Sequence, residues 1–279
     1  MPDRPRLRDV VAKHGLDARK SLGQHFLLDE NLTARIVRAA GPLAGRHVIE
    51  VGPGPGGLTR ALLDTDAAEI VAVEIDPRAV AAIAELAQTD GRLRVVEADA
   101  MRMDAAALCA APRQIVANLP YNVATPLLVG WLRHAAAFER LTLMFQQEVA
   151  ERICAAPGGA EYGRLSVLAQ WTCGARIALR IPAAAFVPPP KVDSAVVVLT
   201  PHAVQPDPAS FAAMERTTAA AFGQRRKMLR GALRSIGGER LLAAADIKPT
   251  RRAETLTIAE FERLAAAHLG MVASSTLVE

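Results

Sequence analysis

The sequence predicts an α/β protein, in which a doubly wound parallel sheet is followed by a smaller all-α domain. Between residues 47 and 147, short runs rich in β-branched residues alternate with helical patterns, which is typical of successive β-α-β units. The runs are almost continuously apolar, as expected of parallel strands that helices cover on both faces. From Ser210 onward the pattern is helical only.

The expected strands follow one another along the first part of the chain. They are HVIEV (47–51), EIVAVEID (69–76), LRVVEAD (93–99), QIVAN (114–118) and RLTLMFQQE (140–148). The helical segments expected after them are GGLTRALLDT, PRAVAAIAELAQ, DAAALCAA, TPLLVGWLRHAA and VAERICAA. ALRIP (178–182) and AVVVLTP (195–201) are expected to close the sheet. A proline-containing linker, HAVQPDP (202–208), then predicts one domain at 1–203 and a second at 204–279.

Composition and charge exclude several classes of protein. The 279 residues are 51% hydrophobic and carry a formal net charge of +4, which is compatible with a polyanionic partner. No apolar run reaches the roughly 18 residues of a membrane span, and the N-terminus lacks the apolar stretch of a signal peptide. Three cysteines without CxxC spacing predict reduced thiols in a cytoplasmic protein. Because the six histidines are scattered, we expect no metal site. We also expect the protein to be a monomer.

A glycine-rich turn, EVGPGPGG (50–57), connects the first expected strand to the first helix. Gly52, Gly54 and a third glycine satisfy the dinucleotide-binding pattern G-x-G-x-x-G. Glu74 ends the next strand, where a carboxylate can hold ribose hydroxyls. A nicotinamide-dependent oxidoreductase is therefore one hypothesis. The two prolines of the turn count against it, because they lack N–H groups that a pyrophosphate needs.

Polar residues also end the third and fourth expected strands, at Asp99 and Asn118. The strand tips therefore surround one crevice, at the edge where open α/β sheets bind ligands. S-adenosylmethionine suits this crevice because carboxylates can hold its adenosine, a glycine turn can hold its amino-acid end, and it has no phosphate. We therefore favour a Rossmann-like methyltransferase sheet that binds S-adenosylmethionine as methyl donor.

The segment NLPY (118–121) places an amide and an aromatic ring just beyond the fourth strand. The exocyclic amine of adenine is a poor nucleophile because its lone pair is delocalised into the ring. Acceptors on its hydrogens, the Asn118 side-chain oxygen and the Leu119 carbonyl, would localise that lone pair, and the following proline keeps Leu119 extended. Tyr121 offers a stacking face, worth about 1–3 kcal/mol per base. This chemistry depends on positioning and fixed dipoles rather than on a strong base.

Six motifs then appear in a characteristic order. They are GQHFL (23–27), EVGPGPGGLT (50–59), VEID (73–76), EADA (97–100), NLPY (118–121) and FVPPPKVDS (186–194). Together they resemble the ribosomal RNA adenine N6,N6-dimethyltransferase family, most closely its bacterial small-subunit (16S) type, from about residue 19 to about residue 262. The resemblance implies a donor site formed by His25, Leu27, Gly52, Gly54, Glu74, Asp99 and Asn118.

The resemblance also implies individual roles. Glu74 would hold the ribose hydroxyls and Asp99 the adenine amine of the donor, while Asn118 would face the target. Tyr121 and Phe186 would sandwich the target adenine after it is flipped out of its hairpin. Position 25 is asparagine in many relatives, and His25 can still make one hydrogen bond there.

Two further segments predict contacts with RNA. Phe186 precedes three prolines that stiffen the chain, and Lys191 adds a charge suited to a phosphate; a core phenylalanine before a turn is the alternative. The segment FGQRRKMLRGALR (222–234) has cations but no anion. As one helix it would carry a basic stripe that attracts phosphate. Its candidate RNA-binding residues are Arg225, Arg226, Lys227 and Arg230.

These observations predict dimethylation of N6 on two adjacent adenosines in a hairpin near the 3′ end of 16S rRNA. The partner would be the small ribosomal subunit, whose assembly the protein would also assist. One alternative is a 23S rRNA adenine methylase that confers macrolide resistance, although such relatives usually lack an FGQRRK-type motif. A second is an assembly factor that binds RNA, with methylation incidental. The nicotinamide-dependent oxidoreductase is the third.

Overall fold

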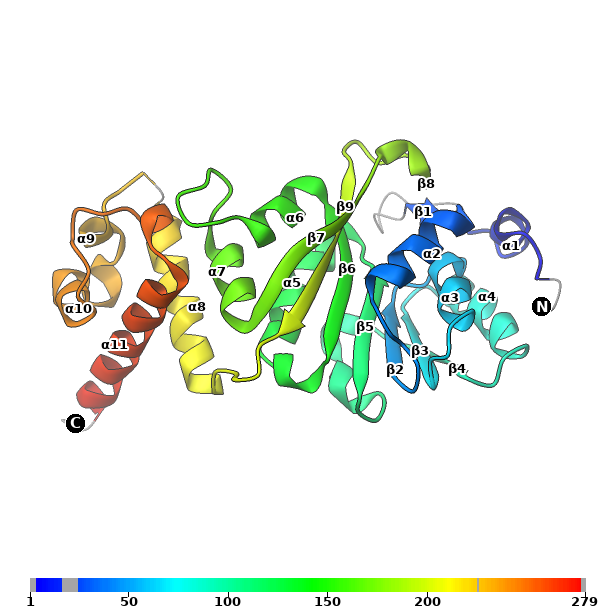
Figure 1. Ribbon diagram of the computed structural model, residues 1–279, viewed down its shortest axis with the longest axis horizontal. Helices are drawn as coiled ribbons and strands as arrows, with labels where there is room; N and C mark the ends of the chain where they lie inside the picture. Colours follow the sequence, from blue (N-terminus) through cyan, green and yellow to red (C-terminus); the bar gives the residue numbers. More distant parts are fainter. Residues whose placement is uncertain (1–3, 17–24, 225, 277–279) are drawn as a thin grey trace. The chain divides into compact units, whose positions relative to one another are not determined.

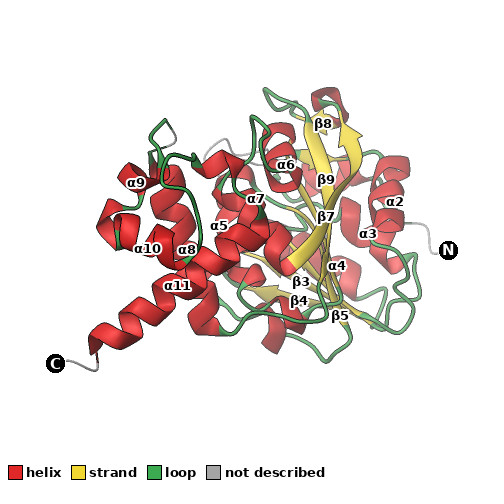
Figure 2. Cartoon of the chain, turned by 60° about the vertical axis from the view of Figure 1, so that its left-hand side comes forward, coloured by secondary structure: helices red, strands yellow, loops and turns green. Residues whose placement is uncertain are grey.

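The computed structural model describes residues 4–16, 25–224 and 226–276, and its central feature is a seven-stranded mixed sheet (Figures 1 and 2). The strand order is β4-β3-β2-β5-β6-β9-β7. The strands are β2 (His47–Val51), β3 (Glu69–Glu74), β4 (Leu93–Glu97), β5 (Arg113–Asn118), β6 (Arg140–Gln146), β7 (Cys173–Ile181) and β9 (Ser194–Pro201). Strands β2 to β6 are parallel to one another, whereas β9 pairs antiparallel with β6.

The order of the strands confirms the predicted doubly wound sheet. From β2 the chain adds β3 and β4 on one side, then crosses to add β5 and β6 on the other. The carboxyl ends of β2 and β5 are therefore the switch point of the sheet, where the adjoining connections diverge and leave a crevice. The central strands are apolar along almost their whole length and buried, as their composition predicted.

Among the described residues, six helices belong to this part of the chain. They are α1 (Leu7–Lys13), α2 (Glu30–Ala39), α3 (Gly57–Leu63), α4 (Pro77–Ala87), α5 (Tyr121–Leu132) and α6 (Gln147–Cys154). The first of them, α1, packs beside α4 and the strand β1 (Phe26–Leu27). Asp29 and Asp76 cap α2 and α4, because their carboxylates accept N–H groups of the first turn. Apolar side chains of α2 and α3 join those of β2 and β3 in one buried cluster.

The helix expected after β4, in DAAALCAA, is wrong. Within this segment the structure has only the 3-10 turn η3 (Ala105–Ala107), and a second such turn, η2 (Ala100–Arg102), lies just before it. Asp99 and Asp104 each accept the N–H two residues ahead, at 2.9 Å in both cases. Such short aspartate-capped turns compete with a continuous helix. The expected segment of eight residues is also too short to form a stable helix by itself.

A second, two-stranded sheet was not expected. β1 (Phe26–Leu27) pairs antiparallel with β8 (Phe186–Val187) (Figure 1). In this register Leu27 lies opposite Phe186. Two-residue strands are too short to show a periodicity in the sequence. Their pairing joins the GQHFL and FVPPPKVDS motifs, of which the residues before His25 lie outside the described residues.

The chain divides into two compact units, Met1–Ala150 with Arg176–Pro201, and Glu151–Ala175 with His202–Glu279. The predicted single boundary near residue 203 differs from this division in one segment, 151–175. Within the second unit, α7 (Arg164–Thr172) contacts α8 (Pro208–Gly223) and α11 (Ile258–Thr276). A helix that packs against elements beyond a linker cannot be assigned to them from local sequence patterns alone.

The single basic helix expected at 222–234 is wrong. Helix α8 ends at Gly223, Met228 is extended, and only Leu229–Ala232 forms the short helix α9, followed by α10 (Gly238–Ala244). The predicted basic stripe therefore does not lie on one helix face. The structure nevertheless exposes Arg226, Lys227 and Arg230 to solvent, as predicted for RNA-binding cations. Arg225 lies outside the described residues.

Two remaining expectations concern membrane segments and cysteines. Within the described part of the chain, no helix is long and apolar enough to span a bilayer. The three cysteines are free thiols; Cys173 is buried, and Cys109 and Cys154 are partly buried.

Candidate active site

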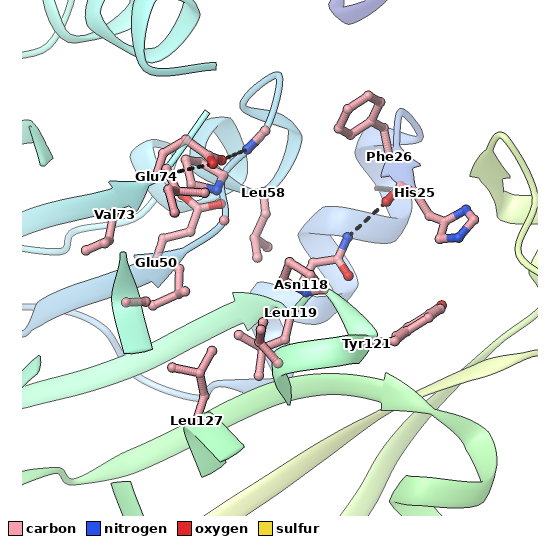
Figure 3. Close-up of a pocket in the computed structure, with 18 of the residues that line it drawn as sticks. His25, Phe26, Glu50, Leu58, Val73, Glu74, Asn118, Leu119, Tyr121 and Leu127 are labelled. Atoms are coloured by element: carbon pink, nitrogen blue, oxygen red, sulfur yellow. Dashed lines mark hydrogen bonds between the residues drawn. The ribbon is translucent and has the colours of Figure 1, made fainter. Parts of the chain in front are cut away.

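A cavity of about 300 Å³ lies where the carboxyl ends of the parallel strands meet the N-terminal segment (Figure 3). The ends of β2, β3 and β5, the segment after β4 and strand β1 all contribute to its wall. The predicted site residues that line it are His25, Leu27, Gly52, Gly54, Glu74, Asp99, Asn118, Leu119 and Tyr121. The fold therefore brings the expected donor-binding and acceptor-binding residues together around one space.

The glycine turn needs glycine for two different physical reasons. Gly52 and Gly54 have φ of +72° and +55°, in the left-handed region that side chains disfavour. Gly57 is needed for space, because a Cβ there would lie 2.5 Å from the Leu27 carbonyl oxygen. The turn can thus approach β1 closely, and the backbone of the turn forms one wall of the cavity.

Glu74 is held rigidly at the end of β3. Its Oε1 accepts the N–H groups of Ile75 (2.8 Å) and Asp76 (2.9 Å), and its Oε2 accepts that of Gly54 (3.2 Å). Burial raises the pKa of this carboxyl, and the three backbone N–H groups oppose that shift. The side chain is therefore fixed between the glycine turn and the start of α4, with its carboxylate facing the cavity (Figure 3).

Glu50 is a cavity residue to which we assigned no role from the sequence. It is 1% exposed, lines the cavity from β2, and its Oε2 has no hydrogen-bond partner among the described residues. Burial raises its pKa from 4.5 to about 8. An acid at the end of a buried strand, just before a glycine turn, was the signal that could have identified it.

Asn118 projects from the end of β5 into the cavity. Its Nδ2 donates to the backbone oxygen of His25 at 3.4 Å (Figure 3). A carbonyl can only accept, so the amide nitrogen faces His25 and the side-chain oxygen remains on the other side as an acceptor. This orientation agrees with the acceptor role predicted for the Asn118 oxygen.

Tyr121 is the first residue of α5 and is fixed at both ends of its side chain. Its hydroxyl lies 2.7 Å from Ser194 Oγ, and its ring stacks on His25 with 5.7 Å between centroids and 29° between planes. The His25 Nδ1 in turn lies 2.8 Å from the carbonyl oxygen of Pro188. Burial raises the pKa of the Tyr121 hydroxyl, so it stays protonated at neutral pH.

Phe186 and Lys191 do not line the cavity. Phe186 is 1% exposed and belongs to the buried apolar cluster beside Leu27, which is the core alternative considered above. The ring that stacks on Tyr121 in this structure is that of His25. Lys191 is exposed in the loop between β8 and β9.

Asp99 combines a cavity position with a structural role. Its Oδ1 accepts the Met101 N–H, and its Oδ2 lies 3.4 Å from Arg102 Nε. Beside it, Met101 and Ile75 present exposed apolar side chains, 46% and 57% accessible, and both line the cavity. Carboxylates, a glycine turn and apolar walls are the groups that an adenosine and an amino acid require, so these residues fit S-adenosylmethionine.

Comparison with known proteins identifies the family. The model of a family described as ribosomal RNA adenine dimethylase matches residues 15–268. The chain belongs to the ribosomal RNA adenine dimethylase family. A protein of Gluconobacter oxydans named ribosomal RNA small subunit methyltransferase A is 66% identical over 266 residues, covering 95% of this chain and 88% of the relative. One of the same name from Paramagnetospirillum magneticum is 58% identical and covers 96% of each chain.

Solved structures of the same kind share the fold. A dimethyladenosine transferase from Plasmodium falciparum superimposes with a TM-score of 0.71 at 24% identity, over 86% of this chain and 96% of the other. The 23S rRNA methyltransferase ErmE gives 0.63 at 26% identity, over 87% and 98%. The enzyme is thus a ribosomal RNA adenine dimethyltransferase of Rossmann-like fold, and its family implies S-adenosylmethionine as methyl donor.

Proposed function

We propose that the enzyme dimethylates N6 of two adjacent adenosines in a hairpin near the 3′ end of 16S rRNA, within the small ribosomal subunit, and also assists subunit assembly. The observation that carries this proposal is the position of NLPY. Asn118, Leu119 and Tyr121 line the same cavity as Glu74 and Asp99, at the switch point of the sheet. A target amine and a methyl donor can therefore meet there.

The acceptor groups of this segment explain how the amine becomes nucleophilic. The Asn118 oxygen and the Leu119 carbonyl accept the two N6 hydrogens, which directs the nitrogen lone pair toward the methyl carbon. Bound S-adenosylmethionine supplies an electrophilic methyl group on a sulfonium. As the N–C bond forms, the S–C bond breaks, its electron pair stays on sulfur, and the amine releases a proton to solvent. For the second methylation a single N–H remains, so one acceptor suffices.

In this proposal the target adenine stacks on the ring of Tyr121. Its hydroxyl contact with Ser194 and its place at the start of α5 fix the ring, so little entropy is lost when a base stacks on it. His25 covers the ring in this structure and would give way to the target adenine. Phe186 would have to leave the core to reach the base, so we assign it to packing instead.

The small subunit is favoured over the large one by the relatives. The proteins from Gluconobacter and Paramagnetospirillum carry names that refer to the small subunit, at 66% and 58% identity. ErmE, described as acting on 23S rRNA, is 26% identical. We accordingly place the reaction in the cytoplasm, where subunits are assembled. We also propose that one copy of the chain acts alone.

Mass spectrometry of small-subunit RNA tests the proposal. RNA from cells lacking the protein should contain two unmodified adenosines where wild-type RNA contains dimethyladenosines. Purified enzyme should restore them on small subunits from these cells, and large subunits should remain unmodified. Asn118→Ala should lower the rate by roughly 100-fold or more, by analogy with the loss of one preorganised polar group. Methylation of large subunits, or an active Asn118→Ala variant, would refute the assignment.

A further inference from the structure

Three potential metal ligands lie together at the amino edge of the sheet, away from the cavity. His47 is the first residue of β2, Glu69 is the first of β3, and Cys109 lies in the segment before β5. Their ligand atoms all lie within 4.8 Å of one another. No metal site was predicted from the sequence, because the histidines are scattered along the chain. The parallel register, which pairs His47 with Glu69, creates the cluster instead.

The separations are close to those of a tetrahedral zinc site. Zinc–ligand bonds of about 2.1 Å to nitrogen or oxygen and about 2.3 Å to sulfur place nitrogen and oxygen about 3.3 Å apart, and sulfur about 3.6 Å from either. His47 Nδ1 already lies 3.0 Å from Glu69 Oε2. Because the three ligand atoms lie within 4.8 Å of one another, each separation from the cysteine sulfur has to shorten by at most about 1.2 Å.

Neighbouring groups orient these ligands, as the surroundings of metal sites do. Arg94 Nε donates to Glu69 Oε1 at 2.9 Å, which leaves Oε2 directed at His47. Arg94 also donates to the Leu108 carbonyl, and Arg113 Nε donates to the Cys109 carbonyl at 3.2 Å. Both arginines thus hold the segment that carries Cys109. Burial and the Glu69 carboxylate raise the pKa of the Cys109 thiol, and the two arginines oppose that rise, so a bound ion would have to displace the thiol proton.

We propose that His47, Glu69 and Cys109 bind one Zn²⁺, with water as the fourth ligand. Thiolate, imidazole and carboxylate together select zinc among the common divalent ions, since Mg²⁺ and Ca²⁺ require oxygen ligands. The thiolate and the carboxylate neutralise the charge of the ion. All three residues are partly exposed, so the ion can enter from solvent. It would join β2, β3 and the segment before β5 without touching the methyl-transfer site.

Titration of the untagged, reduced full-length protein with Co²⁺ and with Zn²⁺ tests this proposal. Co²⁺ should give a thiolate-to-metal absorption band that saturates at one equivalent, and Zn²⁺ should displace it. Cys109→Ser should abolish the band and weaken Zn²⁺ binding more than about tenfold, since even outer-shell changes reach that size. His47→Gln should weaken binding similarly.

Cys154→Ser is the matched control, because Cys154 is also a partly buried free thiol but lies in α6. It should bind Co²⁺ and Zn²⁺ as the wild type does. Thermal unfolding without metal checks that each variant is folded. The wild-type titration decides the matter alone if Cys109→Ser does not fold, since the absence of a saturating thiolate band would overturn the proposal. Equal binding by wild type and folded Cys109→Ser would overturn it as well.

Discussion

Burial and hydrogen bonding have opposing effects on the pKa values of the carboxyl groups in the cavity. Glu74 is buried, yet three backbone N–H groups stabilise its charge. Glu50 is more deeply buried, and burial raises its pKa to about 8. Near neutral pH, Glu50 therefore keeps its proton in the folded enzyme. In the unfolded chain its pKa returns to about 4.5, so the group lowers stability as the pH rises from 4.5 toward 8.

Donor binding should be coupled to the ionisation of Glu50. S-adenosylmethionine is cationic at its sulfonium and ammonium groups, and a cation in the cavity favours the charged carboxylate. Affinity should therefore rise with pH up to about 8, the pKa of Glu50 in the folded enzyme, and binding near pH 7 should release a proton. Calorimetry in buffers of different ionisation enthalpy measures this release. Glu50→Gln should lose it, and an undiminished release in that variant would assign the proton to another group.

At the scale of elements, the pairing of β1 with β8 builds one side of the site. The pair places the Phe186 ring in the core and the His25 carbonyl against Asn118. Gly57 leaves room for the Leu27 carbonyl beneath it. The part of the cavity wall that β1 forms, with His25 beside it, therefore depends on this small sheet.

Substitutions of Phe186 distinguish packing from base stacking. Phe186→Ala should lower the free energy of unfolding by about 3–5 kcal/mol, as expected for a buried phenylalanine. Phe186→Leu keeps most of the volume and should retain both stability and methylation rate. Urea denaturation and initial rates on small subunits measure the two effects. A stable Phe186→Leu enzyme that fails to methylate would return Phe186 to the role of an aromatic partner for the target base.

The sequence predicted the elements that carry strong local signals and missed those that depend on distant partners. The parallel strands and the glycine turn were predicted because apolar runs and turn residues are visible locally. The β1–β8 pair was missed since each strand has only two residues. Phe186 was predicted to stack on the target base, whereas its ring lies buried in the core; a motif does not show which way a ring points. Asn118 was predicted to line the site because a polar residue at a strand tip has few other reasons to be there.

For the whole molecule, the exposed cations of the second unit add a sequence-independent attraction to RNA. Arg226, Lys227 and Arg230 remain exposed although no single helix aligns them. Phosphate binding depends on the number of charges near the backbone and requires no regular stripe. The broken helix therefore changes the predicted geometry of this surface and leaves its predicted electrostatic role unaltered.

The salt dependence of RNA binding measures that role. Replacing Arg226, Lys227 and Arg230 by glutamine should lower the slope of log affinity against log salt by about one for each phosphate that the variant no longer neutralises. Arg46→Gln is the control, because Arg46 lies just before β2, at the sheet edge opposite the cavity, where it pairs with Glu139. Its slope should match that of the wild type. If the triple variant also keeps the wild-type slope, these cations are solvent-facing charges without a phosphate partner, and the RNA must bind through other residues.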